Sequence, residues 1–192
     1  LVDFKGGNKE MAGYTQQALR NTDCNWFYRA SSDSFMKIPG SPIAYWASNK
    51  IMNLFEKDKL SLFADAKVGL QTGDNQAFLR FWHEVKLTDI SFRSESLINK
   101  TWLPYNKGGN MRKWYGNNEY IINWSNNGNL IRNHRGSVIR NEQFYLQPGY
   151  TWTSLTSGIF HARYTADGFL FDTKGPTLFI KKDINILAFV NS

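Results

Sequence analysis

Two amide side chains flank a glycine in the polar turn 71–75, whose sequence is Gln-Thr-Gly-Asp-Asn. Amide groups can pair with base edges, and the backbone N–H groups of a glycine-containing turn can bind a phosphate. We therefore identify Gln71, Thr72 and Asn75 as candidate ligand contacts. A plain helix cap, in which Gly73 serves only the backbone geometry, accounts for the pattern equally well.

A second group of candidates lies in the basic loop 106–116. Its two adjacent glycines allow a ligand to approach the backbone closely, and its cations flank aromatic rings on which bases can stack. The candidate contacts in this loop are Lys107, Gly108, Gly109, Arg112, Lys113 and Trp114. An ordinary basic surface loop is the alternative interpretation.

Three arginines form a third group within one short segment: Arg132, Arg135 and Arg140. A guanidinium group pairs with phosphate oxygens or with the edge of guanine through two parallel hydrogen bonds. The alternative is the solvated face of a basic helix.

The positive charge is concentrated in the same region. The net charge is +7, and the segment from Lys100 to Arg163 contains eight Lys and Arg against only Glu119 and Glu142. Trp and Tyr residues are interleaved with these cations. The combination suits double-stranded DNA or another nucleic acid, whose anionic backbone runs beside stacked bases. A solvated basic face above an aromatic core is the competing interpretation.

The sequence lacks the standard enzyme signatures. It contains no Walker loop, no dinucleotide-binding fingerprint and no Asn-Pro-Pro-aromatic or Asp-Pro-Pro-aromatic tetrapeptide that would hold an extruded adenine. We therefore expect the chain alone neither to methylate nor to cut DNA, and to bind no cofactor. One alternative is a magnesium-dependent nuclease using Asp172 and Lys174, with Asp167 as the upstream acid. Another is an RNA- or carbohydrate-binding module.

Composition limits the remaining classes. The chain has 192 residues, 42% hydrophobic and 16% aromatic, which is typical of a globular protein and not of a disordered or fibrous one. One cysteine and three scattered histidines cannot form a zinc finger, so we expect no metal site. No apolar run is long enough to span a membrane, and no signal peptide is visible. We expect a cytoplasmic protein and a fragment of a longer chain.

The spacing of apolar residues indicates which elements position the candidates. Repeats at three and four residues predict helices over 43–55 and 75–85, and a short basic helix could occupy 130–141. Residues 25–28 could pair as a strand. Runs of alternating and aromatic residues predict strands at 101–105, 119–124, 150–156, 160–164, 168–171 and 177–180. The predicted fold class is α+β, with early helices packed on a curved, mainly antiparallel sheet that has long loops.

Seven segments of the sequence, most of which contain rare combinations of aromatic residues, are similar to segments of one protein family. They are 35–46 (Phe-Met-Lys-Ile-Pro-Gly-Ser-Pro-Ile-Ala-Tyr-Trp), 69–75, 80–85, 102–109, 112–116, 149–152 and 169–172. This order resembles the C-terminal part of the adenine-specific DNA methyltransferases of the BREX phage-defence systems, the PglX type. The family is related to fused restriction-modification enzymes.

The resemblance implies a target recognition domain over 35–192, preceded by a lead-in segment over 1–34. Such a domain reads a short sequence in double-stranded DNA and presents its adenine to a methyltransferase domain upstream in the same chain. In that family the parent enzyme uses S-adenosylmethionine, and the fragment itself is not an enzyme. The resemblance assigns no reader residues, so the candidates above rest on their chemistry and charge.

Overall fold

The computed structural model describes residues 7–182 and 186–192. The chain forms two compact units, the first ending at Lys59 and the second beginning at Leu60. The boundary predicted between residues 34 and 35 concerns the extent of a recognition domain and stays a prediction; residues 1–6 of the lead-in segment lie outside the described residues. None of the helices in the described part of the chain is both long and apolar enough to cross a membrane.

The described part of the first unit, residues 7–59, contains three helices, α1 (Asn8–Arg20), α2 (Ser32–Met36) and α3 (Asn49–Leu54). Helix α3 is shorter than the predicted helix 43–55 because the Ser48 hydroxyl accepts a hydrogen bond from the Ile51 N–H at 3.3 Å and caps the helix there. Residues 25–28 form turns with a single bridge residue, Phe27, and no strand. A small apolar cluster holds this unit together, comprising Ile38, Ala44, Ala47 and Met52.

The second unit contains two four-stranded sheets. The first has the order β1 (Ala64–Lys67), β8 (Thr177–Ile180), β5 (Gly149–Trp152) and β6 (Ala162–Thr165), with every neighbouring pair antiparallel. The second has the order β2 (Leu79–Phe81), β4 (Tyr120–Asn123), β3 (Trp102–Asn106) and β7 (Leu170–Phe171). Its β3–β7 pair is parallel. The predicted α+β class with mainly antiparallel strands is confirmed, and the strands are divided between two sheets.

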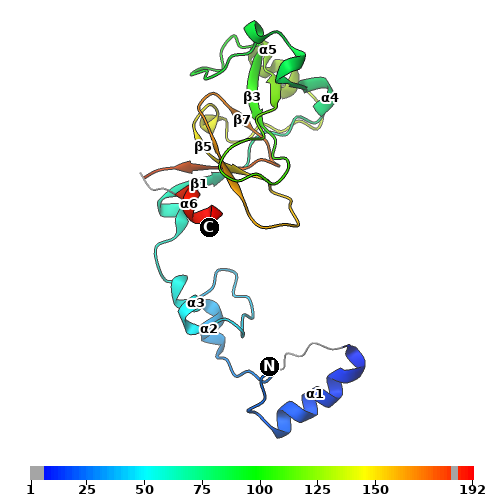
Figure 1. The fold of residues 1–192 in the computed structure, drawn as a ribbon, viewed down its shortest axis with the longest axis vertical. Coiled ribbons are helices and arrows are strands. Elements are labelled where there is room, and N and C mark those ends of the chain that lie inside the picture. The colour runs from blue at the N-terminus through cyan, green and yellow to red at the C-terminus, as the bar shows by residue number, and fades with distance from the viewer. Residues whose placement is uncertain (1–6, 183–185) are drawn as a thin grey trace. The chain divides into compact units, whose positions relative to one another are not determined.

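Short helices complete this unit: α4 (Asn75–Phe78), α5 (Ser125–Arg132) and α6 (Ile186–Asn191), with 3-10 turns η1 (Leu60–Leu62), η2 (Trp82–Glu84), η3 (Leu87–Asp89) and η4 (Glu142–Phe144). In Figure 1, β3 and β7 lie side by side, α4 and α5 lie toward one end of the unit, and α6 lies toward the other.

Two predicted helices in this unit are wrong in extent. The helix predicted over 75–85 ends after one turn, because Leu79 becomes buried in a strand pair with Ile122. The Asp74 side chain does cap its start, accepting from the Ala77 N–H at 3.0 Å. The helix predicted over 130–141 ends at Arg132, and Gly136 turns the following loop with φ +90°.

An aromatic core supports the second sheet. Trp124, Tyr145 and Phe171 are buried, and the Tyr145 ring contacts the other two edge to face, with centroid distances of 6.1 Å to Trp124 and 5.6 Å to Phe171. Tyr105 is buried in the same cluster. These rings stabilise the fold, so part of the aromatic content that suggested stacking with bases is explained by packing.

Candidate functional site

Three chain segments run in parallel and end at the same edge of the second sheet. β3 pairs with β7, with Asn106 opposite Phe171. Leu70 extends the same side of the sheet, because it forms a parallel bridge with Asp172 and its N–H donates to the Phe171 carbonyl at 2.9 Å. Because the three segments run in the same direction, the residues that follow them come together beyond their carboxyl ends.

A pocket of about 360 Å³ lies at this edge. It is lined by the residues that directly follow the three segments: Gln71, Thr72, Gly73, Asn75, Lys107, Asp172, Thr173 and Lys174. Four of the twelve candidates predicted from the sequence therefore share one polar pocket. Two of the three predicted groups, the turn 71–75 and the loop 106–116, contribute to its wall.

Asp172 organises the wall of the pocket. Only 4% of the residue is exposed. Its carboxylate accepts hydrogen bonds from the Tyr105 hydroxyl at 2.8 Å, the Lys174 N–H at 2.7 Å and the Thr173 hydroxyl at 3.0 Å. A buried carboxylate with this many donors is fixed in position, and it fixes the residues that bond to it.

The same carboxylate faces Lys107. The Lys107 Nζ lies 3.7 Å from Asp172 Oδ2. Burial lowers the pKa of the Lys107 ammonium, and the nearby Asp172 carboxylate opposes this effect. Burial also raises the pKa of the Tyr105 phenol well above its ordinary value, and Asp172 adds to that increase. The Tyr105 phenol is therefore protonated at neutral pH, and its hydroxyl lies within hydrogen-bonding distance of both Asp172 and the Leu70 carbonyl.

Hydrogen bonds with one other segment, residues 136–138, hold the turn 71–75. The Gln71 and Val138 backbones exchange two hydrogen bonds of 2.8 and 2.9 Å, and the Ser137 hydroxyl donates to the Thr72 carbonyl. Within the turn, the Thr72 hydroxyl donates to Asn75 Oδ1 at 2.8 Å. Gly73 has φ +75°, and a Cβ there would lie 2.8 Å from Gly136, so the turn packs directly on the loop that contains Arg135.

The two glycines of the basic loop are required by the fold. Gly108 has φ +89°, and a Cβ on it would lie 2.7 Å from the Lys174 carbonyl oxygen. Gly109 has φ +116°, and its carbonyl accepts from the Thr153 hydroxyl at 2.9 Å. Gly108 therefore lets the backbone that follows Lys107 pack directly against the backbone of Lys174.

The rest of the loop lies against β6 and does not line the pocket. Trp114 bonds through its backbone to Ala162 and Tyr164, while its side chain is 51% exposed. The Lys113 ammonium donates to the Asn191 carbonyl at 2.6 Å, which anchors the end of α6. Arg112 is exposed and packs its stem over Gly116. Arg112 and Trp114 thus remain available for contact, whereas Lys113 is engaged.

The three arginines of the third group differ in their surroundings. Arg132 is paired with Glu142, donates to the Asn127 carbonyl at 3.0 Å and lies 5.3 Å from the centre of the Trp124 ring. Arg135 and Arg140 have exposed side chains. Arg135 directly precedes Gly136, which contacts the turn 71–75. Of the three arginines, the fold therefore brings Arg135 next to that turn.

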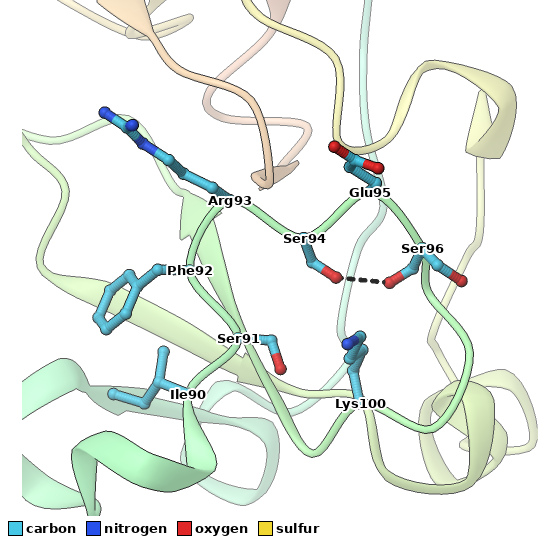
Figure 2. A pocket seen from close by; sticks show the side chains of 8 residues that line it. All are labelled: Ile90, Ser91, Phe92, Arg93, Ser94, Glu95, Ser96 and Lys100. Atoms are coloured by element: carbon cyan, nitrogen blue, oxygen red, sulfur yellow. Dashed lines mark hydrogen bonds between the residues drawn. The ribbon is translucent and has the colours of Figure 1, made fainter.

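A second, larger hollow of about 560 Å³ lies in the loop 90–100 (Figure 2). Figure 2 shows the Ser94 hydroxyl hydrogen-bonded to the Ser96 carbonyl, at 2.8 Å, and the Lys100 side chain pointing into the same space. Arg93 also lines this hollow. None of the candidates predicted from the sequence lines this hollow.

Asp172 belongs to no cluster of metal ligands in the part of the chain that the structure describes. Asp167 lies exposed in a turn and lines a different pocket, together with Arg93 and Phe169. Among residues 7–182 and 186–192, no three His, Cys, Asp or Glu side chains are grouped so that they could hold a metal ion. The hydrogen bonds of Asp172 account for the Asp-Thr-Lys triplet as a structural feature.

The wall of the pocket includes residues that sequence reasoning did not assign to a binding site. The sequence suggests Lys174 only as part of a nuclease and gives Thr173 no role, yet both line the pocket. Tyr105 does not line the pocket but donates to Asp172, which does. Their shared signal is position, because each follows or belongs to a strand that ends at the same edge of the sheet. That signal becomes usable only once the parallel pairing of β3 and β7 is known.

Comparison with known proteins identifies related sequences. The chain is 42% identical over 207 residues to the adenine-specific methyltransferase PglX of Lacticaseibacillus casei (strain Zhang), covering 100% of this chain and 17% of that protein. It is 42% identical over 174 residues to the adenine-specific methyltransferase BrxX of Escherichia coli O9:H4 (strain HS), covering 88% of this chain and 14% of that protein. No protein-family model matches the chain. The chain thus matches a region of BREX-type methyltransferases and spans less than a fifth of each of these relatives.

Proposed function

We propose that residues 35–192 form a target recognition module, with its candidate pocket in the second unit, which binds double-stranded DNA on behalf of an adenine-specific methyltransferase of a phage-defence system. The observation that carries the proposal is the pocket at the edge of the second sheet, where Lys107, Lys174 and two amide side chains surround a fixed carboxylate. Exposed Arg135 lies on the adjoining loop. Cations position a DNA backbone, and amide groups can read base edges.

Catalysis belongs, in this proposal, to other parts of the methyltransferase. The relatives carry the name of adenine-specific methyltransferases, and such enzymes use S-adenosylmethionine. The pocket does not fit that donor: two lysines line it, the carboxylate of Asp172 is already bonded, and a sulfonium cation would therefore find no free anion there. We derive no methyl-transfer step from these residues.

The proposal is tested by titrating a labelled duplex with residues 1–192 at two salt concentrations. We expect a dissociation constant on the order of 10⁻⁶ to 10⁻⁴ M at low salt, and a steep loss of affinity as salt rises, because phosphate contacts release counterions. Absence of binding at low salt, or a flat response to salt, would contradict the proposal.

Two arginine variants provide a matched pair in the same titration. Arg135→Ala should weaken DNA binding and leave the free energy of unfolding unchanged, because its side chain is exposed beside the turn 71–75. Arg132→Ala should instead lower the free energy of unfolding by about 1 kcal/mol, because its ion pair with Glu142 is partly exposed. Incubation with Mg²⁺ and supercoiled plasmid in parallel would reveal a nuclease, which this proposal does not expect.

A further inference from the structure

Thr72 holds the side-chain amide of Asn75 in one orientation. The Thr72 residue is only 3% exposed, and its hydroxyl donates to Asn75 Oδ1 at 2.8 Å. The oxygen and nitrogen of an amide exchange places when the group rotates by 180°, and the two orientations offer opposite hydrogen-bonding groups to a ligand. The hydroxyl could also accept from the amide nitrogen, but its own hydrogen has no other acceptor among residues 7–182 and 186–192. The orientation with the Asn75 oxygen toward Thr72 is therefore the one that satisfies this buried donor.

In this orientation the pocket offers mainly hydrogen-bond donors. The Asn75 Nδ2, with its two hydrogens, is bonded to no other group in the described part of the chain and belongs to an exposed residue. Lys107 and Lys174 add ammonium groups, which can only donate. The acceptor oxygens of Asp172 are engaged by Tyr105, Thr173 and Lys174.

The side-chain amide of Gln71 has the opposite orientation to that of Asn75, because its nitrogen is the bonded end. Its Nε2 lies 3.5 Å from the Gly136 carbonyl and donates weakly to it, so its Oε1 is the acceptor on this side of the pocket. The pocket therefore combines a group of donors with one acceptor amide.

Guanine is the base that matches a group of donors. Its major-groove edge carries two adjacent acceptors, N7 and O6, whereas adenine places the N6–H₂ donor beside its N7. The N4–H₂ of the paired cytosine is a donor, which the Gln71 oxygen could accept. We propose that Asn75 reads a guanine in the major groove and that Thr72 is the positioning residue that sets this preference, an inference that rests on the proposed DNA-binding function.

Phosphate oxygens are also acceptors, so the test must separate base reading from backbone contact. Residues 1–192 are mixed at low salt with duplexes that contain a randomised segment, and the bound fraction is sequenced. The variants are Thr72→Val, which removes the hydroxyl at nearly constant volume, Thr72→Ser, which keeps it, and Asn75→Asp. The matched control is Thr177→Val, a buried threonine on β8 outside the pocket.

The expected result is a guanine preference of about 5- to 150-fold at one position in the wild type, as one good base contact supplies. Thr72→Ser and Thr177→Val should keep this preference, Thr72→Val should admit adenine, and Asn75→Asp should lose guanine. Replacing the selected guanine by 7-deazaguanine, which lacks the N7 acceptor, should weaken binding by the wild type. If Thr72→Val does not fold, the exposed Asn75→Asp variant carries the comparison.

Two other results are distinguishable. Salt-dependent binding without any base preference, or with a guanine preference unchanged in Thr72→Val and Asn75→Asp, would overturn this inference and leave DNA binding intact, since the pocket would then contact phosphate alone. Absence of duplex binding at low salt would overturn the proposed function and this inference together.

Discussion

The ammonium of Lys107 and the carboxylate of Asp172 face each other at 3.7 Å, although they follow two strands that are far apart in the sequence. The two groups have different roles. Asp172 is buried and bonded on all sides, whereas Lys107 is partly exposed at the pocket. Removal of the Asp172 carboxylate should therefore lower stability, and removal of the Lys107 ammonium should weaken DNA binding.

We expect Asp172→Ala to lower the free energy of unfolding by about 3 kcal/mol, because it leaves buried donors unsatisfied beside an unpaired ammonium. Lys107→Met keeps the aliphatic stem and should weaken DNA binding with a much smaller loss of stability. Urea unfolding and duplex titration measure the two quantities. Lys86→Met, at an exposed lysine outside the pocket, is the control. Equal loss of stability in both pocket variants would contradict the division of roles.

Stability should fall as the pH rises above about 10, where an unperturbed tyrosine ionises. Burial raises the pKa of Tyr105 and of Tyr145 in the folded chain. Below pH 10 both states keep these protons, so the stabilisation is complete. At higher pH the unfolded chain releases protons that the folded chain retains, and unfolding becomes favoured.

This dependence is measured by urea unfolding between pH 8 and about 11. Tyr145→Phe removes one of the two groups and should flatten the decline, although Tyr105 would continue to contribute. A decline of the same steepness in Tyr145→Phe would show that other groups cause it.

Gly69→Ala should severely destabilise the second unit. A Cβ at this position would lie 1.7 Å from the Phe171 carbonyl oxygen, which is far inside the contact distance, so the backbone of two segments must separate. The expected loss of stability exceeds about 4 kcal/mol, or the unit fails to fold. Gly158→Ala is the control, since the nearest atom to its added Cβ is 3.6 Å away. The melting temperatures of Gly69→Ala and Gly158→Ala are compared by thermal unfolding. Similar melting temperatures would refute the prediction.

Arg112 and Lys113 are neighbours in the sequence but should behave differently. Lys113→Ala removes the hydrogen bond to the Asn191 carbonyl and should cost about 1–2 kcal/mol of stability, because α6 loses an anchor. Arg112→Ala should leave stability within about 0.5 kcal/mol and lower the affinity for DNA. Urea unfolding and DNA titration of both single variants test this. If Lys113→Ala had the same free energy of unfolding as the wild type, the hydrogen bond to Asn191 would contribute nothing to stability.

The strands of the second unit could be predicted more fully than its helices. Alternating apolar residues located β8 at its observed bounds, Thr177–Ile180, and placed β3 and β4 within a residue or two. The edge strand β1 was missed because Ala64–Lys67 contains Asp, Ala and Lys, which give no strand pattern. Its pairing with β8 is a tertiary effect.

The helix predicted over 75–85 failed for a related reason. Phe78, Leu79 and Trp82 have the spacing of a helix face, but the pairing of Leu79 with Ile122 places β2 there. Local spacing cannot report a partner that lies so far along the chain.

The candidate site was predictable in its parts and not in its assembly. The chemistry of Gln71, Thr72, Asn75 and Lys107 was visible in the sequence, and the pocket gathers all four. The engagement of Arg132 with Glu142 and of Lys113 with Asn191 was not visible, because a cation shows its charge in the sequence but not its partner. Whether the available cations contact DNA stays a prediction.

The bond between Tyr105 and Asp172 spans 67 residues, and the bond between Tyr105 and Leu70 spans 35. The pocket is consequently a late product of synthesis on the ribosome, since Gln71 and Lys107 emerge well before the strand that carries Asp172. Closing such long loops is slow compared with forming local turns. A nascent chain that has produced most of its basic residues therefore still lacks the organised pocket, and that pocket forms only after Lys174 has been added.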